Sequence, residues 1–239
     1  DTKTVSNQTF GTKVTEEPIP IDGYTPASGT AELTIGVDES KNVITFKYKK
    51  RGDLSYAVRY VTMVEGTAVE VADADVVENV EFGSTYEAEA KQVDGYNLVG
   101  DAKKSVTITT GENIITFEYT LRTDISYKVV LKPSDESDTA FESGELDLHE
   151  TYKKAVTIMP PPVDGYTVSP SSMDIVVGVD SEGKFADNQV FTFTYAKRND
   201  LSYTVNYVEK DAGEDGADLV LATAKTVGGQ TFQNKVTET

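Results

Sequence analysis

The chain has 239 residues, a formal net charge of −18, one histidine and no cysteine. A charge this negative makes nucleic acid and anionic membranes unfavourable partners on electrostatic grounds, and we expect neither binding to nucleic acid nor insertion into a membrane. The lack of cysteine excludes disulfides and thiolate metal sites, and a single histidine excludes any site that needs a pair of imidazoles.

A short motif recurs along the chain and divides it into repeats. It reads Asp-Leu-Ser-Tyr at 53–56, Asp-Ile-Ser-Tyr at 124–127 and Asp-Leu-Ser-Tyr at 200–203, at spacings of 71 and 76 residues. Two further motifs keep the same order: Asp-Gly-Tyr at 22–24, 94–96 and 164–166, and Thr-Phe-X-Tyr at 45–48, 116–119 and 192–195. A period of this length lets each unit hold a small core, so the sequence predicts tandem modules rather than one large domain.

The two ends of the chain resemble each other as parts of one repeat. The stretch Lys3-Thr4-Val5 returns 222 residues later as Lys225-Thr226-Val227. We therefore expect residues 1–52 to be the C-terminal part of a truncated repeat, 53–122 and 123–198 to be complete repeats, and 199–239 to be the N-terminal part of a truncated repeat. In the alternative interpretation, the folding unit begins near Lys3 and both ends are self-sufficient.

Alternation of apolar and polar residues predicts strands at equivalent places in each repeat. In the first complete repeat these are a first strand around 56–60, a run around 106–108 and a last strand around 115–119. Residues 86–91 are good helix formers and are expected to hold one or two turns of helix. The last strands carry phenylalanines that are predicted to be buried beside valines of the first strands: Phe46, Phe117 and Phe193 beside Val58, Val129 and Val205.

The Asp-Gly-Tyr motif has two interpretations. Glycine after aspartate is typical of a turn with a positive φ, and the tyrosine would then open the next strand as an anchoring aromatic. Alternatively, the tyrosines are exposed ligand contacts, which makes Tyr24, Tyr96 and Tyr166 the candidate binding residues.

Together these motifs resemble a known family. The succession Leu-Ser-Tyr-X-Val-X-Tyr, Asp-Gly-Tyr and Ile-Thr-Phe-X-Tyr is similar to the mucin-binding-protein (MucBP) repeats of surface proteins from Gram-positive bacteria. The resemblance implies mainly β, α+β modules of the β-grasp or ubiquitin-like kind, strung into an elongated rod that is anchored to the cell wall. It also implies adhesion to mucin, and it supplies no catalytic residues.

Other motifs offer little chemistry. His149 is interpreted as a structural or solvated residue. Carboxylates gather in the loops 135–138 and 211–218, where calcium is an alternative to a solvated loop, and otherwise no cofactor is expected. Arg51-Gly52-Asp53 spells an integrin-binding tripeptide, but the equivalent positions read Arg-Thr-Asp at 122–124 and Arg-Asn-Asp at 198–200, which favours a motif of the repeat junction.

We therefore interpret the chain as a non-enzymatic, extracellular repeat region of a cell-wall-anchored adhesin that binds host mucin or a related glycan. The alternative function is a structural stalk that projects another binding domain. A hydrolase is disfavoured, because no nucleophile, base and orienting group recur together. We also expect head-to-tail self-association, with residues 200–239 of one chain completing residues 1–52 of the next.

Overall fold

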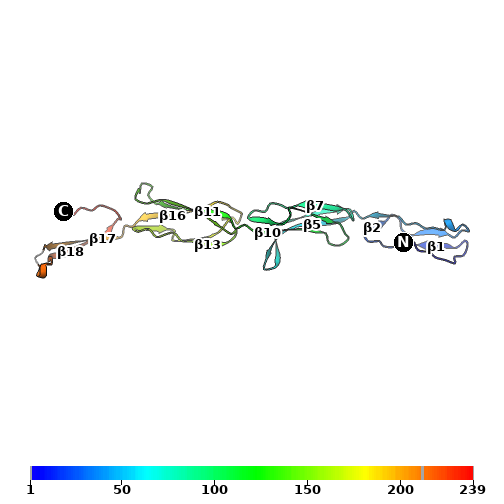
Figure 1. Cartoon of the computed structure of the whole chain (residues 1–239), viewed down its shortest axis with the longest axis horizontal. Coiled ribbons are helices and arrows are strands. Elements are labelled where there is room, and N and C mark those ends of the chain that lie inside the picture. Colours follow the sequence, from blue (N-terminus) through cyan, green and yellow to red (C-terminus); the bar gives the residue numbers. More distant parts are fainter. Residues whose placement is uncertain (1, 211–212, 239) are drawn as a thin grey trace. The chain divides into compact units, whose positions relative to one another are not determined.

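The computed structural model describes residues 2–210 and 213–238, and the chain is built mainly of β-strands (Figure 1). It divides into two compact units, Asp1–Thr120 and Leu121–Thr239. The helical segments within the described ranges are two short 3₁₀ turns, η1 (Glu39–Lys41) and η2 (Glu214–Gly216). The expectation of a mainly β chain is confirmed, whereas these ranges contain no α-helix of the kind that an α+β, β-grasp module would carry.

A mixed four-stranded sheet in the order β6-β5-β10-β8 forms the centre of the first unit. Its strands are β5 (Leu54–Val64), β6 (Thr67–Val80), β8 (Tyr96–Val99) and β10 (Ile114–Leu121). β5 and β6 form an antiparallel hairpin, whereas β5 and β10 run parallel. A parallel pair needs a long crossover between its strands. Here the crossover contains β8 and a two-stranded sheet of β7 (Thr85–Glu89) and β9 (Lys103–Thr107).

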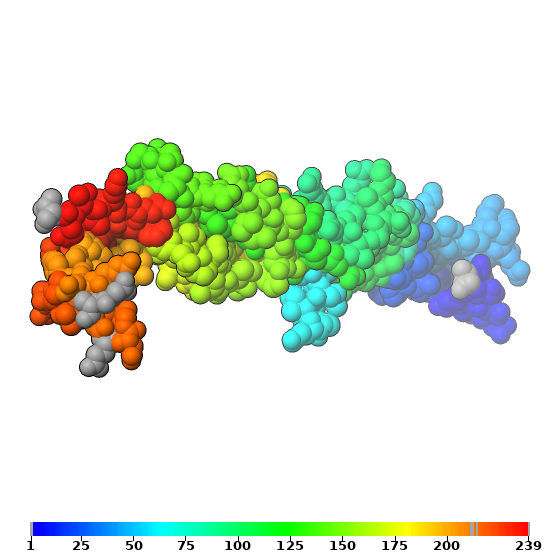
Figure 2. All heavy atoms as spheres, turned by 60° about the vertical axis from the view of Figure 1, so that its left-hand side comes forward, coloured from blue at the N-terminus to red at the C-terminus, as the bar shows by residue number. Residues whose placement is uncertain are grey.

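The β5–β6 hairpin extends past the rest of this sheet. Its turn lies at Glu65 and Gly66, which both have positive φ, as hairpin turns of the primed types require. Register shifts near Tyr60 interrupt the β5–β6 ladder, and such bulges bend a hairpin and increase its twist. The tip therefore projects from the body of the unit and is seen in cyan in Figure 2.

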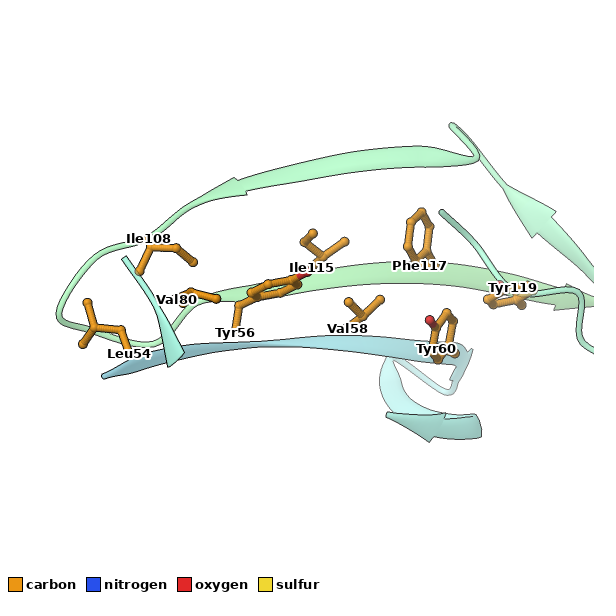
Figure 3. Packing of buried hydrophobic residues seen from close by; sticks show 9 residues of the cluster. All are labelled: Leu54, Tyr56, Val58, Tyr60, Val80, Ile108, Ile115, Phe117 and Tyr119. Atoms are coloured by element: carbon orange, nitrogen blue, oxygen red, sulfur yellow. The ribbon is translucent and has the colours of Figure 1, made fainter. Parts of the chain in front are cut away.

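The core of the first unit contains alternating residues of the three predicted strands, together with Leu54 and Val80, which the sequence analysis did not predict (Figure 3). Its buried members are Leu54, Tyr56, Val58, Tyr60, Val80, Ile108, Ile115, Phe117 and Tyr119. Burying a large apolar side chain contributes roughly 1.5–3 kcal/mol, so this cluster is the main source of stability in the unit. The tyrosine hydroxyls within it have partners, because Tyr60 donates to Asp75 Oδ2 at 2.7 Å and Tyr119 donates to the Lys91 carbonyl at 2.6 Å.

The second unit repeats this architecture. Its mixed sheet has the order β12-β11-β16-β14, with β11 (Ile125–Pro133), β12 (Gly144–Glu150), β14 (Tyr166–Ser169) and β16 (Gln189–Lys197). β11 and β16 again run parallel at the centre, and β13 (Ala155–Ile158) pairs with β15 (Met173–Val176) beside them. Phe117 and Phe193 are both fully buried, as predicted, and so are Val58 and Val129.

The end segments form two-stranded sheets. In the N-terminal segment β1 (Lys13–Glu16) pairs with β3 (Ala31–Thr34), and β2 (Tyr24–Pro26) pairs with β4 (Tyr48–Lys50). In the C-terminal segment β17 (Leu201–Glu209) pairs with β18 (Leu219–Gln230). Phe46 and Val205 are only half-buried here, in contrast to the prediction. The prediction fails at these positions because the described residues of both segments lack the parallel pair that covers the equivalent residues around β5 and β11.

The expectation of a helix at residues 86–91 is wrong. Residues 85–89 form β7, which pairs antiparallel with β9 and places Tyr86 opposite Val106. Tyr86 and Ala88 pack against the core while Glu87 and Glu89 face solvent, so burial with period two overrides the helix propensity of Glu and Ala. The equivalent strand β13 ends at Ile158, before the three prolines of the second complete repeat.

Candidate functional site

The Asp-Gly-Tyr motifs form turns, as the first interpretation predicts. Gly23, Gly95 and Gly165 have φ values of +78°, +79° and +83°. In each motif the tyrosine amide donates to the carbonyl three residues earlier, at 3.0–3.1 Å. A glycine with positive φ at the third position of such a turn is the pattern of type II turns.

The three candidate tyrosines begin strands in three different repeats and are not brought together into one site. Tyr24 opens β2, is 37% exposed and meets the Phe82 ring edge to face at 5.7 Å. Tyr96 opens β8 and is half-buried against the core cluster. Tyr166 opens β14 and meets the rings of Phe141 and Phe232 at 5.2 and 5.7 Å.

Each turn glycine of the first and third motifs lies under an aromatic ring of the following repeat. A Cβ atom at Gly23 would stand 2.4 Å from the Phe82 ring, and one at Gly165 would stand 2.5 Å from the Phe232 ring. No side chain fits there, so glycine is required for its size as well as for its φ. We call the sets Gly23–Arg51–Phe82 and Gly165–Arg198–Phe232 the junction contacts.

Main-chain hydrogen bonds complete both junction contacts. The Arg51 amide donates to the Gly23 carbonyl at 2.9 Å, and the Phe82 amide donates to the Arg51 carbonyl at 2.8 Å. The Arg198 and Phe232 amides make the same two bonds, at 2.9 and 2.8 Å. The end of one repeat is thereby tied to the first hairpin of the next.

The arginine and aspartate of each Arg-X-Asp motif pair with each other. Arg51 Nε and Nη2 donate to the two Asp53 carboxylate oxygens at 2.9 and 3.0 Å, and the pairs at 122–124 and 198–200 have the same geometry. Hydrogen bonds from the guanidinium hold the pKa of Asp53 below its ordinary value. Both charges of the Arg51-Gly52-Asp53 tripeptide are therefore directed at each other, which agrees with the junction interpretation.

A polar groove of about 510 Å³ lies in the second unit. It is lined by Ser134, Asp135, Ser137, Asp138, Thr139, Ala140, Lys197, Thr231 and Gln233. These residues come from the loop between β11 and β12, the end of β16 and the segment after β18. Sequence analysis did not identify the groove, because its lining comes from three separate parts of the chain.

Asp138 organises the groove. Its side chain is 7% exposed and accepts hydrogen bonds from Lys197 Nζ at 2.9 Å, the Tyr166 hydroxyl at 2.9 Å and the Ala140 amide at 3.1 Å. Burial alone would raise the pKa of Asp138, but the bonds from Lys197 and Tyr166 outweigh it and lower the pKa. Burial and the bond to this carboxylate raise the pKa of the Tyr166 hydroxyl. The candidate residue Tyr166 is therefore not part of the groove lining, but its hydroxyl helps to hold Asp138 in place.

Asp135 and the serine next to it shape the rim of the groove. Asp135 Oδ1 accepts hydrogen bonds from the Ser137 hydroxyl at 2.6 Å and from the Ser137 amide at 2.9 Å. The hydroxyl bond is the main reason that the pKa of Asp135 lies below its ordinary value. Thr139 is exposed on the same rim. The rim therefore presents hydroxyl groups beside an ionised carboxylate.

The calcium alternative gains no support from the part of the chain that the structure describes. Those residues contain no group of three or more His, Asp or Glu side chains arranged to hold a metal ion. In the loop 135–138, Asp135 and Asp138 accept hydrogen bonds from protein donors instead. In the loop 211–218, residues 211 and 212 lie outside the described residues.

His149 lies on β12 and is exposed, as expected of a solvated residue. Its Nδ1 atom is 3.1 Å from the Ser126 hydroxyl on the neighbouring strand β11. It lines a second open groove, of about 540 Å³, together with Ser126, Tyr127, Lys128, Asp147, Asn188 and Val190.

Among residues 2–210 and 213–238, no helix has the length and apolar character needed to cross a membrane.

The chain is similar to two curated proteins. It is 27% identical over 231 residues to Internalin J of Listeria monocytogenes serotype 4b (strain F2365). This match covers 91% of the present chain and 24% of that protein. It is 28% identical over 137 residues to Internalin J of Listeria monocytogenes serovar 1/2a (strain ATCC BAA-679 / EGD-e), which covers 55% of this chain and 15% of that protein. The chain thus spans a quarter or less of the length of these relatives.

Two solved structures are also similar. The crystal structure of Mub-RV matches 60% of this chain and 98% of its own, with 13% identity and a TM-score of 0.22. The type 2 repeat of the mucus binding protein MUB from Lactobacillus reuteri matches 60% and 99%, with 11% identity and a TM-score of 0.22. The family model of the MucBP domain matches residues 57–120, from the first strand to the last strand of the first complete repeat. Residues 57–120 of the chain are therefore a match to the MucBP domain, the family that the repeated motifs resemble.

Proposed function

We propose that this chain is a non-enzymatic repeat region of a bacterial surface adhesin, and that the polar groove of the second unit binds neutral sugars of mucin or a related glycan. The observation that carries the proposal is the groove itself, with its hydroxyls and Asp135 next to the ion pair of Lys197 with the buried Asp138. The MucBP domain at residues 57–120 supports the adhesin assignment. An extracellular position on the cell wall is part of the same proposal.

The chemistry of the groove suits sugar hydroxyls. Each sugar hydroxyl both donates and accepts a hydrogen bond, and the groove offers hydroxyls of Ser134, Thr139 and Thr231 beside the Asp135 carboxylate. Hydrogen bonds to charged acceptors are stronger than those between neutral groups, so Asp135 would contribute most to orienting a sugar.

The charge of the groove favours neutral sugars over sialylated or sulfated ones. Its lining carries two carboxylates, Asp135 and Asp138, against the single ammonium of Lys197. The whole chain carries a net charge of −18. An anionic sugar would approach a negative field from the protein and a groove whose one cation is already paired.

A glycan array tests this proposal. Thr139→Arg fills the rim of the groove with a long side chain and is expected to reduce binding of neutral mucin glycans at least tenfold. Thr30→Arg is the matched control, because it makes the same change at an exposed residue of the first unit. Equal glycan binding by both variants would contradict the groove as the site, and preferential binding of sialylated glycans by the unaltered chain would contradict the choice of neutral sugars.

The junction contacts favour a second function, that of a spacer. Each ties consecutive repeats together through an aromatic ring over a glycine and two main-chain hydrogen bonds, which is what a stiff stalk requires. A spacer needs no ligand of its own. Failure of the unaltered chain to bind mucin or any glycan on the array would favour this function over adhesion.

A further inference from the structure

One edge of the sheet in the second unit is open, and we propose that it binds an extended peptide in which apolar and basic residues alternate. The peptide would add to β12 as a further strand. β12 shares no residue with the lining of the groove that Asp138 organises, so this proposal does not depend on the proposed function.

β12 is an edge strand that lacks the usual features that protect an edge. It pairs with β11 on one side, and within residues 2–210 and 213–238 no strand pairs with it on the other. Its seven residues follow β11 without a register shift and include neither proline nor lysine. By contrast, register shifts interrupt the equivalent edge strand β6, and β14 at the other edge of this sheet has four residues. Bulges, short strands, lysine and proline all hinder pairing at an edge, so β12 remains able to accept a further strand.

The main-chain groups of alternate residues on β12 are directed away from the sheet. The Ser126 carbonyl accepts a hydrogen bond from the Asn188 amide at 2.9 Å, so the main-chain groups of Ser126 are directed towards β16. Main-chain direction alternates along a strand, and the groups of Tyr127 are therefore directed towards β12. The residues of β12 that do not lie opposite these groups have their amides and carbonyls at the open edge. They are Glu145, Asp147 and His149.

The inner face of β12 is apolar and partly uncovered. Leu146 lies opposite Val129 and Leu148 lies opposite Tyr127, and both of these residues of β11 are buried in the core. Residues opposite each other share a face of the sheet, so the two leucines extend the core face to the open edge. Leu146 is 50% exposed and Leu148 is 37% exposed. Apolar residues of a further strand would cover them.

The outer face of β12 is acidic. Lys128 Nζ lies 2.7 Å from the Glu145 carboxylate but 3.8 Å from the Asp147 carboxylate, and the Asp147 side chain is 77% exposed. One ammonium group therefore serves two carboxylates at this edge. A basic residue of a further strand, placed opposite Asp147, would pair with the carboxylate that Lys128 holds less closely.

Charge favours a basic peptide over a second copy of this chain. Antiparallel pairing of two β12 strands centred on Asp147 would bring the two Asp147 carboxylates opposite each other, and like charges in that position are destabilising. Each chain also carries a net charge of −18. A strand with lysine or arginine on its outer face and valine or leucine on its inner face complements both faces of β12.

Fluorescence anisotropy with a labelled peptide of alternating lysine and valine tests the proposal. The peptide has seven residues, the length of β12, and binding to the whole chain is measured at about 0.15 M salt to screen distant charges. One control peptide has glutamate in place of lysine. A second control keeps the lysines but is N-methylated on their main-chain amides, so it retains the charge and cannot donate hydrogen bonds to the edge. Both controls are expected to bind at least tenfold more weakly.

Two matched pairs of variants locate the binding site. His149→Pro removes an amide that faces the open edge and should weaken binding at least tenfold, whereas His149→Thr keeps the amide and should bind like the unaltered chain. Asp147→Lys reverses a charge beside the peptide and should also weaken binding at least tenfold. Glu182→Lys makes the same change at an exposed residue of this unit outside β12 and should have little effect. Circular dichroism confirms that each variant is folded.

Four results would overturn the proposal. The first is no binding of the lysine peptide by the unaltered chain. The second is equal binding of this peptide and its N-methylated form, a comparison that needs no altered chain. The third is equal binding by His149→Pro and His149→Thr. The fourth is a dimer of the unaltered chain in sedimentation velocity that His149→Pro abolishes, which would show that the edge takes a second copy instead of a peptide.

Discussion

At the scale of the residue, the glycine of the Asp-Gly-Tyr motif has two separate requirements. Its positive φ is a property of the turn, and this much can be read from the sequence. The absence of a side chain leaves room for the aromatic ring of the next repeat, which lies within 2.5 Å of the place that a Cβ would occupy. That second requirement comes from tertiary packing and has no local signal.

The two requirements can be separated by mutation. Gly100→Ala carries the cost of a positive φ alone, about 1 kcal/mol, because its φ is +82° and nothing lies within 4 Å of its Cβ position. Gly23→Ala carries a similar φ cost and must also displace the Phe82 ring, which should add roughly 1–3 kcal/mol. Urea denaturation of both variants measures the difference in the free energy of unfolding. In a Phe82→Ala background the excess cost of Gly23→Ala should disappear. If Gly23→Ala and Gly100→Ala, each made in the otherwise unaltered chain, unfold at the same urea concentration, contact with the Phe82 ring adds no requirement for glycine at position 23.

Asp138 should make the stability of the second unit depend on pH. Its pKa in the folded chain lies below the ordinary aspartate value of 3.8, so the ionised form stabilises the fold at pH values above 3.8. This contribution is lost as the pH falls through the lowered pKa of the folded state. Asp138→Asn should therefore be less stable than the unaltered chain at pH 7, and the difference should shrink as the pH falls below 3.8.

Thermal melting at several pH values measures this effect. Asp164→Asn is the control, because Asp164 is exposed in the same unit and does not line the groove, and it should change the melting temperature little at any of these pH values. A constant difference between Asp138→Asn and the unaltered chain from pH 7 to pH 2 would contradict the assignment.

At the scale of the element, the first and last strands of the complete repeats could be predicted because each buries one face. Tyr56, Val58 and Tyr60 on β5 alternate with more exposed residues, and that alternation is visible in the sequence. The strand β7 was missed because its residues favour helix and its neighbour β9 is distant in sequence. The groove could not be predicted from the sequence, because its lining residues come from three separate parts of the chain. The candidate residue Tyr166 does lie next to it and donates a hydrogen bond to Asp138.

One buried polar residue connects the two central strands of the first complete repeat. Asn113 precedes β10, is 6% exposed, and donates to the Ser55 carbonyl on β5 at 3.0 Å. Its side-chain oxygen accepts from the Thr109 amide at 2.8 Å, and its amide group also donates to the Thr109 and Gly111 carbonyls. The side chain thus holds the loop between β9 and β10 against β5.

Replacing Asn113 should weaken this part of the sheet. Asn113→Ala removes all of these part-buried hydrogen bonds and is expected to cost about 1–3 kcal/mol of unfolding free energy. Asn97→Ala is the matched control, since Asn97 is exposed on β8, and it should change the free energy by less than about 0.5 kcal/mol. Chemical denaturation measures both, and hydrogen exchange should show faster exchange at Ala57, whose amide bonds to the Asn113 carbonyl at 2.9 Å. Equal stability of the two variants would show that Asn113 has no structural role.

At the scale of the whole molecule, the sequence predicts an elongated rod. Few residues separate the last strand of one repeat from the first strand of the next, as between Tyr48 and Leu54, and the junctions lack the Gly/Ser run of a flexible linker. A compact single domain of this length would have a radius of gyration of about 18 Å. We expect small-angle X-ray scattering to give a value well above this. A value near 18 Å would rule out the rod.

The parallel pairing of β5 with β10 determines how a complete repeat responds to tension. The chain enters the repeat at the start of β5 and leaves it at the end of β10, and these two points lie at opposite ends of a parallel pair. Pulling the ends apart therefore slides the two strands past each other and loads their hydrogen bonds simultaneously. In an antiparallel hairpin such as β17–β18, the same pull separates the hydrogen bonds one after another. Repeats built this way would remain folded under the drag of flowing fluid, and single-molecule pulling should show high unfolding forces for 53–122 and 123–198 and a low force for the C-terminal hairpin.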